Sequence, residues 1–322
     1  MIKLVCFTLA AAVLLLCPAA HAQSTYPTKT VKFIVPFGPG GPTDVIARLV
    51  GERLSAKWGQ QVIVENIAGG GGNTGTAAAA KAAPDGYTLL AVSTGFIVNP
   101  SLYAKVPYDL KTTFAPVSLF AKSPNIMSVH PSVPAKTVKE LIELIKANPG
   151  KYSYAQPATG STPHLAGELF KLQYGLDLAT VSHNSAAAAI TNTLGGHTPI
   201  AITMLPAAQP NIQAGKLRGL AVLSKTRVPG LPDVQTMAEA GIPDQESDTL
   251  TGFVAPAATP PDLVRRIQGE MAALIAVPEV RKQLEDLGFE PVASSPEAFA
   301  ARIETESAKW TKIIRDAKIR VE

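Results

Sequence analysis

The chain has 322 residues, enough for two domains, with a formal net charge of +4 and only 6% aromatic residues. Its basic residues are spread along the chain without a basic run, so nucleic-acid binding is not expected. After the first 22 residues, no apolar stretch approaches the roughly 20 residues that span a membrane. The composition therefore indicates a globular protein.

The first 22 residues have the pattern of a secretory signal peptide: Lys3, an apolar run and small residues ending at Ala22. We expect cleavage after Ala22 and export of the mature protein. The two cysteines, Cys6 and Cys17, both lie in this segment, so the mature protein would have no disulfide, thiolate metal site or cysteine nucleophile. Lipidation of Cys17 is disfavoured because Leu16, rather than a small residue, precedes it.

The stretch FIVPFGPGGPTDVIARL, residues 33–49, predicts a strand, a sharp turn and a helix. Its first three residues are an apolar run typical of a buried strand. Three glycines then permit a tight turn, and Pro42 presets the backbone for a helix start. Because the first N–H groups of a helix lack intrahelical partners, they attract anions. We therefore expect an anion-binding turn, with Asp44 as a helix cap rather than a ligand contact.

Short strands and helices alternate through the first half of the chain, which predicts a mostly parallel sheet with helices on both faces. The expected strands are 31–35, 62–65, 87–92, 117–120 and 126–129, and the expected helices are 42–57 and 76–83. We expect residues 93–95 to form a small polar loop. Residues 121–124 are expected to cross from one lobe to another.

Residues 70–75, GGGNTG, match the dinucleotide-binding pattern G-x-G-x-x-G. That site also requires an acidic residue about 20 positions later, where this chain has Gly95. No lysine follows Gly75, so a P-loop is not supported either. A structural or cleft-lining glycine turn is the favoured interpretation, and no cofactor is expected.

A second strand, turn and helix are predicted in residues 151–170, KYSYAQPATGSTPHLAGELF. Pro157 and Pro163 are six residues apart, as are Pro36 and Pro42, and glycine lies between them in both stretches. Either turn alone could be an ordinary connection. Two such turns at the carboxyl ends of strands predict two similar lobes that face a shared cleft.

The second half of the chain repeats the alternation of helices and strands. The expected helices are 137–147, one that begins at 163, 186–194, 261–276, 279–287 and 296–318, and the expected strands are 152–155, 178–181, 200–204, 220–224 and 251–255. The last helix has one apolar face, formed by Phe299, Ile303, Trp310 and Ile314.

Six stretches, which cover nearly the whole mature chain, together resemble the periplasmic solute receptors of the tripartite tricarboxylate transporter system, the Bug family. They are VKFIVPFGPGGPTDVIARL, WGQQVIVENIAGGGGNTGTAAAAKAAPDGYTLL, YDLKTTFAPVSLFAKSPN, ATGSTPHLAGELF, AGKLRGLAVLSKTRVPGLPDVQTMAEAG and LGFEPVASSPEAFAARIETESAKW. The resemblance implies an α/β type II periplasmic-binding-protein fold, in which two lobes joined by a hinge close on a small organic carboxylate in a central cleft. It also implies that the protein is not an enzyme and delivers its ligand to inner-membrane transporter subunits.

On this basis we expect a signal peptide at 1–22, a first lobe made of 23–122 and 252–322, and a second lobe made of 123–251. We expect the receptor to be a monomer.

The resemblance implies that the loops 36–44 and 159–164 hold a carboxylate through main-chain N–H groups and ordered water. Elsewhere the chain departs from the family. Residues 181–185 are VSHNS where the family usually has VPYKG, Thr203 stands where it often has an aspartate, and Leu250 replaces an expected cleft tryptophan. Without that aspartate a ligand ammonium group would lack a partner, so we expect a ligand that is not an amino acid. Loss of the tyrosine and the tryptophan suggests room for a bulkier acid, including an aromatic dicarboxylate.

The expected ligand contacts lie at strand ends and helix starts. They are Phe37, Gly38, Gly40, Gly41, Ser93, Thr94, Thr159, Gly160, Ser161, Thr162, His164, His183, Asn184 and Thr203. For His183, contact with the ligand and support of its own loop both remain open. His164 and Glu168 are spaced to share a metal ion, but two ligands do not make a site. We therefore expect no metal, and for His164 packing or a hydrogen bond at the helix start is favoured over metal binding.

Two other functional classes stay open at this point: an exported enzyme that acts on the same kind of acid, and a sensor subunit that passes the liganded state to a membrane kinase. No G-x-S-x-G motif surrounds Ser93 or Ser161, so neither is an expected hydrolase nucleophile. We expect no catalytic residue.

Overall fold

The structure is a computed structural model in which residues 26–320 are described. The predicted signal peptide and its cleavage site lie outside the described residues. Within residues 26–320, no helix has both the length and the apolar character needed to cross a membrane.

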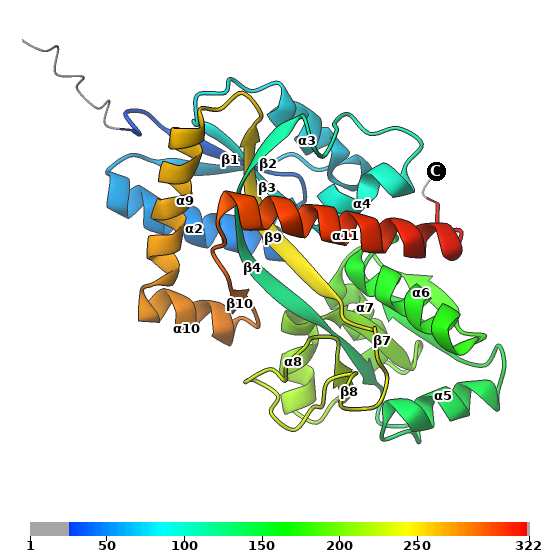
Figure 1. Ribbon diagram of the computed structural model, residues 1–322. Coiled ribbons are helices and arrows are strands. Elements are labelled where there is room, and N and C mark those ends of the chain that lie inside the picture. Colours follow the sequence, from blue (N-terminus) through cyan, green and yellow to red (C-terminus); the bar gives the residue numbers. More distant parts are fainter. Residues whose placement is uncertain (1–25, 321–322) are drawn as a thin grey trace, which may run out of the picture.

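The strands form one continuous, strongly curved sheet that runs through the whole molecule (Figure 1). Its order is β2 (Val62–Asn66), β1 (Val31–Val35), β3 (Thr88–Ser93), β9 (Asp248–Pro256), β4 (Phe114–Val129), β7 (Ile200–Met204), β5 (Ser153–Gln156) and β6 (Ala179–Ser182), while β8 (Arg218–Val222) and β10 (Glu290–Pro291) also pair with β4. β1 is parallel to β2 and β3, and β5 is parallel to β6 and β7. We call these two parallel groups, with their helices, the first and the second half of the sheet.

Helices cover both faces of each half, as the alternating pattern predicted. They are α2 (Pro42–Trp58), α3 (Asn73–Ala80), α4 (Thr94–Leu102), α5 (Val138–Lys146), α6 (Thr162–Tyr174), α7 (Ala186–Leu194), α8 (Leu205–Gln213), α9 (Pro261–Ile275), α10 (Pro278–Asp286) and α11 (Pro296–Asp316), with a short 3-10 turn at Gly70–Gly72. In Figure 1, α2 and α9 flank the first half, α5 to α8 surround the second, and α11 runs across the upper part of the long strands.

Each half has its own apolar core. Within a half, neighbouring residues of a strand face opposite sides of the sheet, so one strand packs against helices on both faces. In β1, Phe33 packs in the cluster under α2 and α9, while Ile34 packs with Phe299 of α11 on the other face. In the second half, Tyr154 packs with Phe170 of α6. The predicted apolar face of the last helix is confirmed: all four of its side chains are buried.

The connection between the halves differs from the prediction. We expected two short strands, 117–120 and 126–129, with the crossing at 121–124, but β4 runs unbroken from Phe114 to Val129. It pairs with β9 as far as Pro124 opposite Asp248. Pro124 lies within this strand, since an extended strand accepts a proline where no ladder hydrogen bond is required. Two neighbouring antiparallel strands therefore carry the chain across and back.

Two helices that contain prolines were not predicted. Residues 93–95, predicted as a loop, end β3 and open α4, which contains Pro100. α8 was not predicted and contains Pro206 and Pro210. A proline in the first turn of a helix removes no hydrogen bond, which explains how α8 can begin there.

Candidate ligand-binding site

The turn between β1 and α2 is held in shape by Asp44. Gly40 has a left-handed backbone, with φ of +85°, and its N–H donates to Asp44 Oδ2 at 2.9 Å. The same carboxylate accepts from Arg48 Nε at 2.9 Å and from Asn66 Nδ2 at 2.8 Å. Burial by itself would raise the pKa of Asp44, but these hydrogen bonds outweigh it and keep the pKa below its ordinary value. Asp44 therefore stabilises the turn in its ionised form by capping Gly40, while the N-cap of α2 is Gly41, so the predicted helix cap is not at Asp44.

The turn between β5 and α6 has the same backbone shape but a different capping side chain. Gly160 has φ of +81°, and its N–H donates to Nδ1 of buried His164 at 3.1 Å. In both turns the glycine lies two residues before the helix and four before its acceptor. The hydrogen bonds thus align Gly40 with Gly160, while the prolines that indicated the repeat are offset by one residue.

His164 is a structural side chain in its neutral form. Because Nδ1 accepts a hydrogen bond, the ring proton lies on Nε2, which is 3.8 Å from Glu168 Oε1. Burial lowers the pKa of His164, which keeps the ring neutral. Glu168 also accepts hydrogen bonds from the side chains of Tyr154, Thr180 and Lys171. In the described part of the chain, no group of three or more His, Cys, Asp or Glu side chains is arranged to hold a metal ion.

Other backbone N–H groups at the two turns have no hydrogen-bond partner within residues 26–320. They belong to Gly38, Gly41 and Thr43 in the first turn and to Thr159 and Thr162 in the second. At a helix start such donors also carry the positive end of the helix dipole. Each turn therefore offers donors of the kind that bind an anion. Gly40 and Gly160 shape the turns instead, since their own N–H groups are occupied.

A third helix start lies beside the first turn. Ser93 caps α4 by accepting from the Gly95 N–H at 3.1 Å, and Thr94 Oγ1 accepts from the Leu250 N–H at 2.9 Å. The ring of Phe37 lies next to Gly95. The structure thus gathers three of the predicted contact residues, Phe37, Ser93 and Thr94, at one end of the first half.

The glycine run 70–75 supports this arrangement by close packing. A side chain at Gly75 would come within 2.8 Å of the Pro36 Cα atom, and one at Gly72 within 3.3 Å of the Phe37 ring. The run therefore lets the backbone lie against the first turn, as the structural interpretation of these glycines predicted.

The two halves meet at β9. Thr162, at the start of α6, contacts the hydroxyl of Thr249, and the next residue of β9, Leu250, is bonded to Thr94 at the start of α4. A Cβ at Gly160 would lie 2.5 Å from Leu102 Cδ1 of α4. The starts of α4 and α6 therefore flank the crossing strand, and predicted contacts from both halves come together there.

Three polar side chains of the second half end in buried atoms without a hydrogen-bond partner: Gln156 Nε2, His183 Nε2 and Thr203 Oγ1. His183 and Thr203 were predicted contacts, and the neighbouring Asn184 is exposed. Gln156 was not predicted. Its position as the last residue of a strand, directly before a predicted anion-binding turn, is a signal that could have found it.

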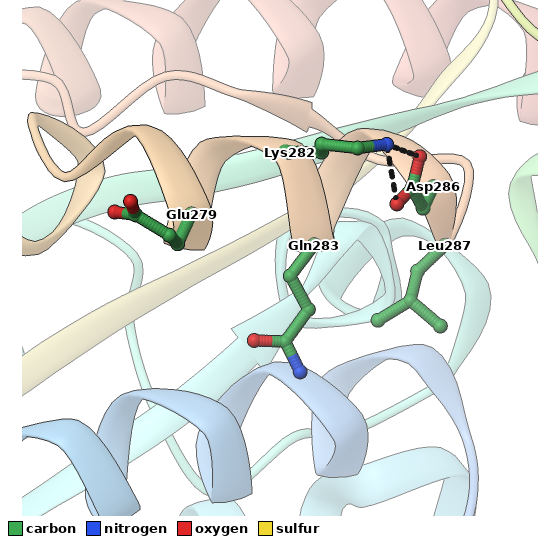
Figure 2. A pocket seen from close by; sticks show the side chains of 5 residues that line it. All are labelled: Glu279, Lys282, Gln283, Asp286 and Leu287. Atoms are coloured by element: carbon green, nitrogen blue, oxygen red, sulfur yellow. Dashed lines mark hydrogen bonds and ion pairs between the residues drawn. The ribbon is translucent and has the colours of Figure 1, made fainter.

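Two surface hollows lie on other elements. One runs along α10 and is lined by Glu279, Lys282, Gln283, Asp286 and Leu287 (Figure 2). The second is lined by residues that precede β1 and β3 and by the start of α9, among them Tyr26, Tyr87 and Arg266. In the first hollow Lys282 pairs with Asp286 at 2.8 Å, so its only cation is already neutralised. Neither hollow contains a residue of the two glycine turns.

Residues 46–319 match the protein family described as "Tripartite tricarboxylate transporter family receptor". The chain belongs to this family. Protein BugT of Bordetella pertussis is 34% identical over 300 residues, which are 92% of this chain and 92% of BugT. The solved structure of R. palustris Rpa4515 with adipate is 35% identical, with a TM-score of 0.84, and the match covers 92% of this chain and 99% of that one. MatC of Rhodopseudomonas palustris with bound malate is 28% identical, with a TM-score of 0.79, over 90% of this chain and all of MatC.

Membership of the tripartite tricarboxylate transporter receptors confirms the predicted Bug-family resemblance and the two-lobe periplasmic-binding-protein fold. The protein is a solute-binding receptor for a tripartite transporter and not an enzyme. The family is periplasmic, which agrees with the predicted export.

Proposed function

We propose that this receptor captures a small dicarboxylate between its two lobes and delivers it to the inner-membrane subunits of its transporter. The observation that carries the proposal is the pair of glycine turns, each with unpaired N–H groups at the start of a helix. Adipate and malate, bound by two similar proteins, are both dicarboxylates and support this ligand class.

A ligand with an ammonium group is disfavoured by the charges at the turns. Asp44 is engaged by Gly40, Arg48 and Asn66 and has no free oxygen for such a group. Thr203 offers a hydroxyl where a carboxylate would be required. The ligand is therefore an acid without an amino group.

Room for an aromatic dicarboxylate depends on position 183 rather than on position 250. Leu250 is buried in the core with Val254 and Phe299, so the absence of a tryptophan there does not enlarge the cleft. His183 lies at the end of β6 with a polar atom unpartnered. An aromatic diacid would have to fit beside this ring.

We also propose that the lobes are 23–122 with 252–322, and 123–251, and that they close about the paired crossing strands β4 and β9. The separate apolar cores of the two halves support this division. Each lobe would then move as a rigid body while the two strands bend. All of the proposed contacts come from one chain, so a monomer suffices.

Calorimetric titration of the mature chain tests the ligand class. After removal of co-purified ligand, aliphatic and aromatic dicarboxylates, monocarboxylates and amino acids are added in turn. Four or five charge-assisted hydrogen bonds at about 1.5–3 kcal/mol each, less the costs of association, predict micromolar binding, or about −8 kcal/mol. Binding of amino acids but not of dicarboxylates would contradict the proposal, and so would a crystal structure in which the ligand lies far from both turns.

A further inference from the structure

The side chain of Asn66, the last residue of β2, joins three parts of the first glycine turn. Its Nδ2 donates to the Phe37 carbonyl at 3.0 Å and to Asp44 Oδ1 at 2.8 Å, and its Oδ1 accepts from Arg48 at 2.8 Å. The carbonyl and the carboxylate can only accept hydrogen bonds, and the guanidinium can only donate them. These three partners therefore fix the orientation of the Asn66 amide.

One of these hydrogen bonds also sets the direction of the Gly38 N–H. The peptide bond between Phe37 and Gly38 is trans. In a planar trans peptide the C=O and the N–H point in opposite directions. Because the Phe37 carbonyl points to Asn66, the Gly38 N–H points to the opposite side of the turn.

The surroundings of Gly38 leave room for a bound group. Gly38 is exposed, and a Cβ at Gly38 or at Gly41 would meet no heavy atom within 4 Å. Within residues 26–320 the Gly38 N–H has no hydrogen-bond partner, and the N–H groups of Gly41 and Thr43 at the start of α2 are unpaired as well. Gly38 can therefore donate to an anion without giving up a bond inside the protein.

Removal of the Asn66 amide would leave two acceptors facing each other. The Phe37 carbonyl and Asp44 Oδ1 now share the Nδ2 group of Asn66 as donor. Without it, the partial charge of the carbonyl and the charge of the carboxylate repel each other. Rotation of the peptide plane between Phe37 and Gly38 would relieve this repulsion, and it would exchange the positions of the carbonyl and the N–H. The turn would then present an acceptor where it had presented a donor.

We propose that Asn66 is a positioning residue, which directs the Gly38 N–H at a ligand carboxylate by holding the Phe37 carbonyl on the other side of the turn. The proposal rests on the proposed function, in which unpaired N–H groups of the glycine turns bind the ligand. Both hydrogens of the Asn66 amide are already used inside the protein, so Asn66 acts through Gly38. Because the N–H is held in place before the ligand arrives, binding requires no further ordering of this peptide.

Calorimetric titration with straight-chain dicarboxylates of four to eight carbons, adipate among them, tests the proposal with two variants. Asn66→Ala removes the amide, and Asn66→Asp keeps the shape of the side chain but has no N–H to donate. Both are expected to weaken dicarboxylate binding by about 10- to 100-fold, the usual effect of losing a hydrogen bond to a charged group. Asn148→Ala is the matched control, because that amide also donates to a backbone carbonyl, of Leu144 at 2.9 Å, but just after α5. It should leave binding unchanged.

NMR spectroscopy of the Gly38 amide separates the direction of this N–H from a general loss of stability. Saturation of the wild type with the dicarboxylate that binds it most tightly should move the Gly38 amide proton downfield, as a new hydrogen bond to a carboxylate does. The shift should be absent in Asn66→Ala at saturation. A variant that had lost only stability would keep it.

The outcomes separate the role of Asn66 from the proposed function. A Gly38 amide proton that does not move when the wild type binds a dicarboxylate would overturn the role of Asn66, whether or not the variants fold. Affinity equal to the wild type in either Asn66 variant would overturn it too, and both results would leave the receptor for carboxylates intact. Failure of the wild type to bind any carboxylate would overturn both.

Discussion

The two glycine turns each contain a left-handed glycine, but a different side chain accepts the hydrogen bond from that glycine. In the first, the buried carboxylate of Asp44 caps Gly40 and is itself bound by Arg48 and Asn66. In the second, the neutral ring of His164 caps Gly160 in a buried position. The first turn is exposed, with no heavy atom within 4 Å of a Cβ at Gly40, whereas Gly160 lies against Leu102 of α4.

This difference shows that the second turn is part of the contact between the halves, while the first belongs to one half alone. A substitution at the second turn should therefore lower the stability of the fold as well as weaken ligand binding. A change at the first should affect mainly its own N–H groups. The following predictions test this contrast, from the largest expected effect to the smallest.

Gly160→Ala should be the most damaging single change in either turn. Its left-handed backbone costs a β-carbon about 1–2 kcal/mol, and the clash with Leu102 adds about 1–3 kcal/mol. Gly40→Ala should cost only the backbone strain of about 1–2 kcal/mol. Urea denaturation and ligand titration measure both effects.

Gly59→Ala is the control for backbone strain, because Gly59 is left-handed with open space around it and lies at the distant end of α2. It should lower stability about as much as Gly40→Ala without weakening binding. If Gly160→Ala is no worse than Gly40→Ala, the proposed contact between the halves does not contribute to stability.

Removing either cap should leave a glycine N–H unpaired and cost about 1–3 kcal/mol of stability. Asp44→Ala should lie at the upper end, since Arg48 and Asn66 lose their partner as well. Asp44→Asn keeps an acceptor oxygen and should recover part of the loss, as measured by denaturant unfolding at pH 7. Equal stabilities of the Ala and Asn variants would show that Asp44 does not cap the turn.

Acidification should destabilise the second turn before the first. Because burial lowers the pKa of His164, the folded state resists the proton that an unfolded histidine takes up below about pH 6.5. The ring carries no penalty above that pH, and a destabilising penalty grows as the pH falls below it. The lowered pKa of Asp44 gives a stabilising contribution that is complete above about pH 4 and declines as the pH falls towards the folded pKa.

Denaturation at pH 7, 5.5 and 4 measures this order. In His164→Asn, which cannot titrate, the loss of stability between pH 7 and 5.5 should shrink. A loss as large as in the wild type would assign the effect to another group.

Arg48→Met should have the smallest effect, below about 1 kcal/mol. The Arg48 side chain is 52% exposed, so solvent screens its ion pair with the buried Asp44 carboxylate, and Asp44 keeps its hydrogen bonds from Gly40 and Asn66. Ligand affinity, measured by titration, should stay within a few-fold of the wild type. A drop of about tenfold or more would instead make Arg48 a direct ligand contact.

Much of the candidate site could be predicted because its signals are local. The run from Phe33 to Pro42 contains the strand, the glycines and the helix start that together make an anion-binding turn, and the same signals recur before Pro163. The parts that could not be predicted depend on partners distant in the chain or on context. The continuity of β4 through Pro124 depends on β9, more than 120 residues later, and α4 begins at Thr94, within the residues predicted as a loop.

The sequence by itself determined the alternating strands and helices, the two glycine turns and the family, because these depend on residue spacing and on the backbone freedom of glycine and proline. Only the tertiary structure decided which N–H groups remain available: it assigned Gly40 to Asp44 and Gly160 to His164, and it left the Gln156 nitrogen without a partner. The physical reason is that a donor bonds to whichever acceptor folding brings within about 3 Å of it. Residue spacing along the chain does not show which groups those are.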